Sequence, residues 1–338
     1  MPKRMPAGWK PPYAAHDAEF PPDFQAAVSG YFGAQSRSGD ATELVEWFRR
    51  AARHEDGPEA LERAQVVDRE GYRNDFFVAY WTSPERYARW EASDAFRGFW
   101  DDPRRLRGPI GYWREVLQVP KERFEVNFSD PFKAGLTARA TGYKLEHRHG
   151  YWGSARDRIP AADSDDLASP LGMRLPSPTE HASFGRRLRV TSPENLCVIR
   201  SGQDWSQLTG DPRADYLNEM EPTLREGMLY LRDNPVEAGC CSNRYARFTD
   251  VDGNPREETA GIGHFLSLAH LEAWAASHPT HVAIFRSLMK LAPKLGVEVP
   301  LLLWHEVFVL PAEGQRFEYV NCHPRTGLLP WFEVREIG

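Results

Sequence analysis

The strongest constraint on this chain is an internal repeat. Residues 77–100 read FVAYWTSPERYARWEASDAFRGFW, and residues 261–285 read GIGHFLSLAHLEAWAASHPTHVAIF. Three positions match at one fixed offset: Ser83, Trp90 and Ser93 in the first stretch, and Ser267, Trp274 and Ser277 in the second. Further along, GYWREV at 111–116 matches LLWHEV at 302–307. Self-similarity of this kind predicts one structural unit used twice in the chain.

The two copies differ at two positions that matter for chemistry. His281 and His305 lie in the second copy, where the first has Arg97 and Arg114. Imidazole titrates near neutral pH and is a common metal ligand, whereas guanidinium is neither acid nor ligand at that pH. The difference predicts one working site in the second half, with the first half as its structural twin.

Hydrophobic periodicity and turn residues predict the same order of elements in each half. In the first half we expect a strand, a helix, two strands, a helix and a strand, at residues 26–35, 40–54, 63–69, 75–82, 84–100 and 111–119. In the second half the corresponding ranges are 195–200, 212–233 with a kink at Pro222, 242–249, 257–266, a helix from 268 interrupted at 277–279, and 301–310. The order β-α-β-β-α-β is the ferredoxin-like arrangement, so the predicted class is α+β with two such units packed sheet to sheet.

Four regions follow from this pattern. They are an N-terminal arm at 1–23, a first unit at 24–124, a connector with some strand at 125–190, and a second unit with a C-terminal tail at 191–338.

Composition narrows the partners. The chain of 338 residues has a net charge of −6, which gives no reason to expect nucleic acid or an anionic membrane. It contains no apolar run of membrane-spanning length, and its first residues lack the pattern of a signal peptide. The cysteines form no C-x-x-C pair, so free thiols in the cytoplasm are expected: Cys197, Cys240, Cys241 and Cys322.

Both histidines are predicted to point inward. His281 shares a helical face with Ile284, Phe285 and Leu288, and His305 alternates with aliphatic residues along its strand. Two imidazoles facing one cavity could place a metal or haem iron opposite a second working group. Hydrogen-bonded core histidines would give the same pattern. The chain has no C-x-x-C-H motif, so covalent haem attachment is not indicated.

Several longer motifs resemble the haem-containing aldoxime dehydratases, from about residue 10 to 328. They are HGYWGSARDRIP at 149–160, NLCVIRSGQDW at 195–205, LRDNPVEAGCCSNR at 231–244, SHPTHVAIF at 277–285, WHEVFV at 304–309 and FEYVNCHPRTG at 317–327. The resemblance implies a tandem ferredoxin-like α+β barrel that holds haem b, ferrous in the active state. The implied reaction is loss of water from an aldoxime, R-CH=N-OH, to give a nitrile.

The resemblance also implies roles for single residues. His281 matches the axial haem ligand and His305 the distal acid–base group, while Ser201, Arg158 and Glu125 match further groups of the distal pocket. Each of these three has an ordinary alternative: a turn serine before Gly202, a surface pair with Asp157, and a solvated carboxylate at a strand end.

Other functions are compatible with the same scaffold. A haem peroxidase or chlorite dismutase-like enzyme is one alternative, and a non-catalytic haem-binding protein is another. The segment 286–300 is longer than the family pattern, and Cys241 replaces an expected aromatic residue, so the pocket shape could differ. The expected ligand is a small aldoxime, and a homodimer is one expected assembly.

Overall fold

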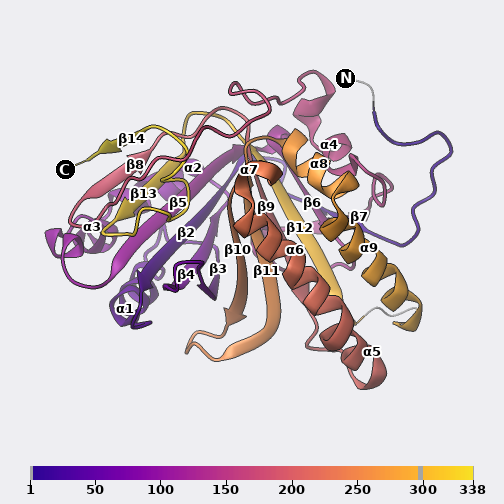
Figure 1. Ribbon diagram of the computed structural model, residues 1–338, viewed down its shortest axis with the longest axis horizontal. Coiled ribbons are helices and arrows are strands. Elements are labelled where there is room, and N and C mark those ends of the chain that lie inside the picture. Colours follow the sequence, from indigo (N-terminus) through magenta and orange to yellow (C-terminus); the bar gives the residue numbers. More distant parts are fainter. Residues whose placement is uncertain (1–2, 296–299, 338) are drawn as a thin grey trace.

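A computed structural model describes residues 3–295 and 300–337 of the chain. Within them, fourteen strands form one sheet, antiparallel at every pairing, with helices on its faces (Figure 1). The strands are β1 His16–Glu19, β2 Ala26–Ser36, β3 Ala60–Val67, β4 Arg73–Trp81, β5 Gly111–Pro120, β6 Phe124–Phe128, β7 Gly142–Leu145, β8 Arg187–Val190, β9 Leu196–Asp204, β10 Cys240–Thr249, β11 Pro255–Phe265, β12 Leu302–Leu310, β13 Arg316–Val320 and β14 Val334–Glu336. The predicted α+β class is confirmed at this level.

Helices α1 to α3 belong to the first half, α4 to the connector, and α5 to α9 to the second half. They are α1 Thr42–Ala51, α2 Pro84–Ala92, α3 Asp94–Trp100, α4 Ser154–Arg158, α5 Gly210–Asp215, α6 Glu221–Asp233, α7 Pro235–Ala238, α8 Leu268–Ser277 and α9 Pro279–Leu291. None of the described helices is long and apolar enough to cross a membrane.

Three of the repeated serines precede helices, Ser83 before α2, Ser93 before α3 and Ser267 before α8, whereas Ser277 is the last residue of α8. Ser83 caps α2 by accepting a hydrogen bond from the Arg86 amide, and Ser93 caps α3 through the Phe96 amide. The single helix predicted at 84–100 is therefore wrong, because a capping serine begins a new helix inside it. The predicted break at 277–279 is confirmed: α8 ends at Ser277, and α9 begins at Pro279 with His278 as its cap.

The helix expected at 212–233 is interrupted before Pro222. A π-helical turn at Tyr216–Met220 joins α5 to α6. Pro222 has no N–H to donate to the carbonyl four residues earlier, which is consistent with the wider π-helical turn just before it.

The two halves pair their strands in the same order. The first half reads β3-β4-β2-β5, the second reads β10-β11-β9-β12, and β3 pairs with β10 to join them. Gly33 lies opposite Trp113 in the first half, as Gly202 lies opposite Trp304 in the second. A Cβ at either glycine would lie 2.2 Å from the tryptophan ring, so the same close packing occurs twice.

One face of the whole sheet buries a shared core, which includes Trp113, Trp304 and Tyr319. Helices α1 to α3 pack over the other face of the first half, and α6 and α8 over that of the second. The arm and the connector contribute β1, β6 and β7 beside β12. Residues 296–299, which belong to the longer segment noted at 286–300, lie outside the described residues.

Candidate active site

Two predicted site residues of the second half, His305 and Ser201, lie side by side on the helix-covered face of the sheet, whereas His281 lies apart from them on α9. His305 on β12 lies directly opposite Ser201 on β9 and Asn127 on β6. Directly opposed residues of an antiparallel pair project to the same face. Glu125, two residues before Asn127, shares that face as well. Four polar side chains therefore gather over three adjacent strands.

Arg158 reaches this group from α4 and completes a three-residue cluster. Its Nε donates to Oε2 of Glu125 at 2.8 Å, and its Nη2 lies 3.0 Å from Nε2 of His305. Oε1 of Glu125 lies 2.9 Å from the same His305 nitrogen, at ion-pair distance but outside hydrogen-bond alignment. Nε2 of His305 thus has a cationic donor on one side and a carboxylate acceptor on the other.

Glu125 is held in its ionised form. Burial would raise the pKa of this carboxyl, but the positive charge of Arg158, helped by His305, lowers the pKa to about 2. Both Glu125 and Arg158 have side chains only 2% exposed, so solvent screens this pair little. A carboxylate that stays charged beside an imidazole favours a proton on the facing ring nitrogen.

His281 lies on α9 between two indole rings. The ring centroids of Trp274 and Trp152 lie 4.6 and 5.7 Å from its own. Its Nδ1 is buried and has no hydrogen-bond partner within the described residues. Burial lowers the pKa of His281 to about 4, and the Ala275 backbone opposes this shift only in part. The ring is therefore neutral at pH 7, the form that binds a metal.

The expected depth of the two histidines is wrong. The His305 side chain is 30% exposed, and His281 is half-buried. Helix α9 packs mainly against α6 and α8, and Leu291 is its only buried residue. The apolar face of α9 and the face of β12 near His305 consequently remain partly uncovered.

The structure excludes the ordinary alternatives for the other three residues. Arg158 and Asp157 are 6% and 3% exposed, so they are not a surface pair. Ser201 lies within β9 and not in a turn. Glu125 is 4% exposed and ion-paired, not solvated.

Two contributors were not predicted from the sequence. Asn127 lies beside His305, and its Nδ2 is buried and has no hydrogen-bond partner among residues 3–295 and 300–337. Trp152 contacts His281 although it is far from it in sequence. The spacing of Glu125 and Asn127 along one strand was a usable signal for the first, whereas the contact of Trp152 depends on the course of the connector.

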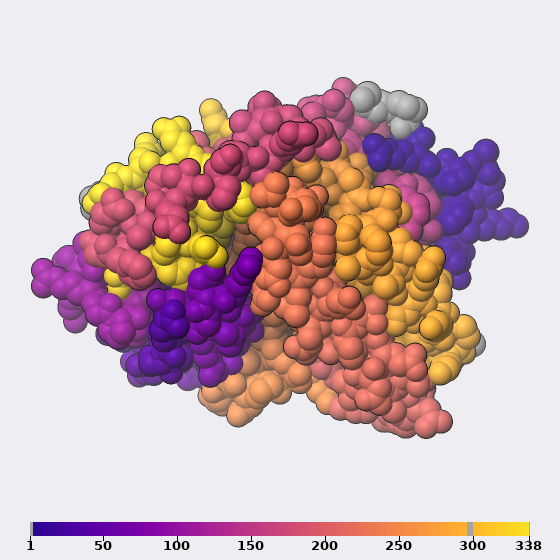
Figure 2. Space-filling model, viewed as in Figure 1, coloured from indigo at the N-terminus to yellow at the C-terminus, as the bar shows by residue number. Residues whose placement is uncertain are grey.

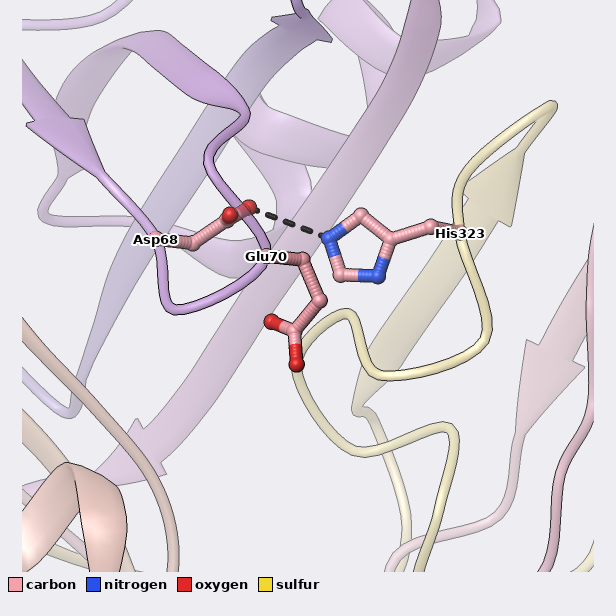
Figure 3. A group of neighbouring side chains, drawn as sticks. All are labelled: Asp68, Glu70 and His323. Carbon is pink, nitrogen blue, oxygen red and sulfur yellow. Dashed lines mark hydrogen bonds and ion pairs between the residues drawn. The ribbon is translucent and has the colours of Figure 1, made fainter.

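A separate group of two acidic residues and a histidine connects the first half to the C-terminal tail. Asp68, Glu70 and His323 have potential ligand atoms close together (Figure 3). Asp68 already accepts hydrogen bonds from His323 Nε2 at 3.0 Å and from Asn74 Nδ2 at 2.9 Å, and Glu70 pairs with Arg325. These bonds give the three residues a structural role: they hold the loop that contains Asp68 and Glu70 against the buried His323.

The residues around α9 fit a haem. His281 offers a neutral imidazole flanked by indole rings. The half-buried residues Ile284, Phe285 and Leu288 of α9 give an apolar surface that the protein itself does not fully cover. An axial nitrogen ligand next to apolar surface is what a non-covalently bound haem requires.

Comparisons with known proteins agree with this geometry. The family described as haem-containing dehydratase matches residues 30–328, so the chain belongs to that family. It is 39% identical to phenylacetaldoxime dehydratase of Bacillus sp. (strain OxB-1), covering 99% of this chain and 96% of that protein. It is 38% identical to aliphatic aldoxime dehydratase of Pseudomonas chlororaphis, covering 97% and 93%.

Solved structures support the same assignment. A crystal structure of an aldoxime dehydratase superposes with a TM-score of 0.90 at 36% identity, covering 97% of this chain and 94% of that one. An aldoxime dehydratase crystallised with butyraldoxime gives a TM-score of 0.89 at 35% identity, covering 97% and 92%.

Proposed function

We propose that this chain removes water from aldoximes to form nitriles, with haem b held by His281. The observation that carries the proposal is the cluster of Glu125, Arg158 and His305 next to Ser201, in a member of a haem-containing dehydratase family. Relatives named for phenylacetaldoxime and aliphatic aldoximes support this substrate class.

The reaction needs one acid, one base and no external oxidant. The N–O bond of R-CH=N-OH breaks, the oxygen leaves as water after gaining a proton, and the carbon loses its hydrogen as a proton. Ferrous haem, when bound, supplies electron density at the oxime nitrogen, which weakens the N–O bond. The protein must deliver the first proton and remove the second.

His305 can do both at one ring nitrogen. The ionised Glu125, whose Oε1 lies 2.9 Å from Nε2 of His305, favours a proton on that nitrogen, which leaves Nδ1 to exchange protons with the substrate. Within the described residues, Nδ1 has no hydrogen-bond partner. As imidazolium, His305 donates from Nδ1 to the departing oxygen, and as imidazole it accepts the carbon-bound proton there.

Ser201 and Arg158 support that cycle. The Ser201 hydroxyl projects from the same face beside His305, where it can hold the oxime hydroxyl by a hydrogen bond. Arg158 keeps Glu125 ionised, so the carboxylate beside Nε2 stays charged while Nδ1 of His305 loses and regains its proton.

We also propose the finer architecture. The equal strand orders β3-β4-β2-β5 and β10-β11-β9-β12 support two ferredoxin-like units in a barrel-like pair, at 24–124 and 191–338, with an arm at 1–23 and a connector at 125–190. A homodimer is our proposal for the assembly, and sedimentation of the purified protein tests it.

The test of function is a spectrum and an assay on one sample. The protein is reconstituted with haem, reduced under nitrogen, and mixed with phenylacetaldoxime or butyraldoxime. We expect a Soret band that shifts on mixing and nitrile as the product. A Soret band without a shift or nitrile would favour a haem-binding protein or a peroxidase-like enzyme, and no Soret band would overturn the haem assignment.

A further inference from the structure

The N-terminal arm wraps the segment 149–158, which carries Arg158. The Trp9 indole donates to the His149 carbonyl at 2.9 Å and packs edge-on against Tyr151 at 5.6 Å between centroids. Tyr13 packs on His149 at 5.0 Å. Figure 2 shows the arm, dark blue at the right, beside the magenta residues of this segment and the orange helices α8 and α9.

Asp157 is the centre of this contact. Its carboxylate accepts hydrogen bonds from the backbone amides of Arg4 and Met5, both at 2.9 Å, and from the Tyr151 hydroxyl at 2.8 Å. The side chain is buried, at 3% exposure. A buried carboxylate is costly unless donors surround it, so the two amides of the arm are part of what keeps Asp157 in place.

The wrapped segment touches both sides of the proposed haem site. Trp152 contacts His281 at 5.7 Å, and Arg158 contacts Glu125 and His305. Arg148 connects Asp157 to Arg158 directly, since it donates to the Asp157 carbonyl at 3.0 Å while its own carbonyl accepts from Nη1 of Arg158.

The segment has little internal means of holding Arg158. Helix α4 is only five residues long, and helices of that length are not stable by themselves. Besides the bonds of Arg158 itself and of Arg148, two ties hold its neighbours: Arg156 pairs with Glu272 of α8, at 2.8 Å, and Asp157 bonds the arm. Arg4 also pairs with Glu272 at 3.0 Å, so the arm reinforces both ties.

We propose that residues 3–13 form a strap that positions Arg158 through Asp157, and that Asp157 is a positioning residue for the acid–base step at His305. The inference rests on the proposed function. Asp157 itself contacts neither His305 nor Glu125 through any bond in the described residues; it acts by fixing the backbone from which Arg158 projects.

The test targets one amide donor of the strap. Met5→Pro deletes the N–H that bonds Asp157 and also fixes the backbone φ of residue 5, while Met5→Ala keeps the N–H and serves as the control, because Met5 is 44% exposed. We expect Met5→Pro to lower kcat about tenfold, the effect of losing one hydrogen bond to a charged group, with haem content and KM nearly unchanged. Met5→Ala should match the parent protein.

A double-mutant cycle separates positioning from general loosening. In an Arg158→Lys background the planar fork of the guanidinium is already lost, so Met5→Pro should cost less than twofold more. Asp157→Asn, as a second variant, should lower kcat and shift its pH profile, because Arg158 borders the acid–base histidine. Equal tenfold losses in both backgrounds, or no loss with Met5→Pro, would overturn the proposal. If the parent protein makes no nitrile, the proposed function fails instead.

Discussion

The two halves share a fold but differ in one row of side chains across the sheet. In the first half the row contains Arg114, Phe32 and Phe77, which are mutually opposite on β5, β2 and β4. The matching row of the second half is His305, Ser201 and Gly261 on β12, β9 and β11. Two buried phenylalanines are thus replaced by a serine and a glycine, and a guanidinium by an imidazole.

Because of these replacements, the helices cover the two rows to different extents. In the first half Arg114 is enclosed by Glu318 at 2.8 Å, by Glu91 and by the rings of Phe96 and Trp100. In the second half α9 has only Leu291 buried. One copy of the scaffold is filled as a core, and the other keeps small and polar residues over which a ligand can bind. The duplication supplies stability on one side and chemistry on the other.

The largest expected effect is on haem binding, and it should differ between His281 and its counterpart Arg97. His281→Ala should abolish stoichiometric haem binding, because it removes the neutral imidazole ligand, whereas Arg97→Ala should keep it, because Arg97 is exposed. Haem per chain, from the pyridine haemochrome assay, measures both. Haem loss in the Arg97 variant, or full retention with an unaltered spectrum in the His281 variant, would break the comparison.

A smaller loss is expected from Glu125→Gln. The amide cannot hold the charge that favours a proton on Nε2 of His305, so kcat should fall by roughly 10- to 100-fold while haem remains bound. Steady-state nitrile formation at saturating aldoxime gives the value. An unchanged kcat would show that the Glu125–His305 contact is structural only.

In the first half, a substitution of Arg114, the counterpart of His305, should lower the stability of the protein and leave catalysis unchanged. Arg114→Ala leaves Glu318 buried without one of its cationic partners, so the free energy of unfolding should fall by about 3 kcal/mol. Urea denaturation and nitrile formation per bound haem measure the two properties. A stable variant with low turnover per haem would reverse the roles of the halves.

The smallest effects concern the glutamates that follow Arg114 and His305. Burial would raise the pKa of Glu115, but two bonds from Arg244, at 2.6 and 2.7 Å, lower it to about 2. Glu306 accepts from the Tyr80 hydroxyl and the Leu136 amide, and burial raises its pKa to about 7.

The stability contributions of Glu115 and Glu306 change with pH in opposite directions. Stability from Glu115 is present above pH 4.5 and lost as pH falls towards 2, whereas stability from Glu306 is present below pH 4.5 and lost as pH rises through about 7. Glu306→Gln should therefore cost less at pH 8 than at pH 5, by up to ~2 kcal/mol, and Glu115→Gln should cost less at pH 3 than at pH 7. Parallel losses at every pH would contradict the difference.

Much of this arrangement could be predicted from the sequence. The repeat and its periodicity predicted most strands and helices of the two units to within a few residues, because each half needs the same apolar faces, but they did not predict the strands outside the units, such as β1, β6, β8, β13 and β14. The motifs around Arg158, Ser201 and His305 led to residues that the structure brings together. Of their neighbours on β6, Glu125 was predicted from the resemblance, and Asn127 was not predicted.

The predictions that were wrong or missing have local physical causes. The helix at 84–100 is divided because Ser93 caps a second helix, and a capping serine inside a helical pattern looks like an ordinary surface residue. The depth of His305 was overestimated because alternation along β12 shows which residues share a face but not what covers it. The contacts of Asp157 with Arg4 and Met5 join residues about 150 positions apart, which no periodicity can indicate.

The central claim is that the second half works through an acid–base imidazole at His305. The most direct measurement is nitrile formation per bound haem in His305→Ala. We expect haem binding to persist and the rate to fall by about 100-fold or more, since no other imidazole is assigned to the proton transfers. A haem-loaded variant that forms nitrile at the parent rate would contradict the account.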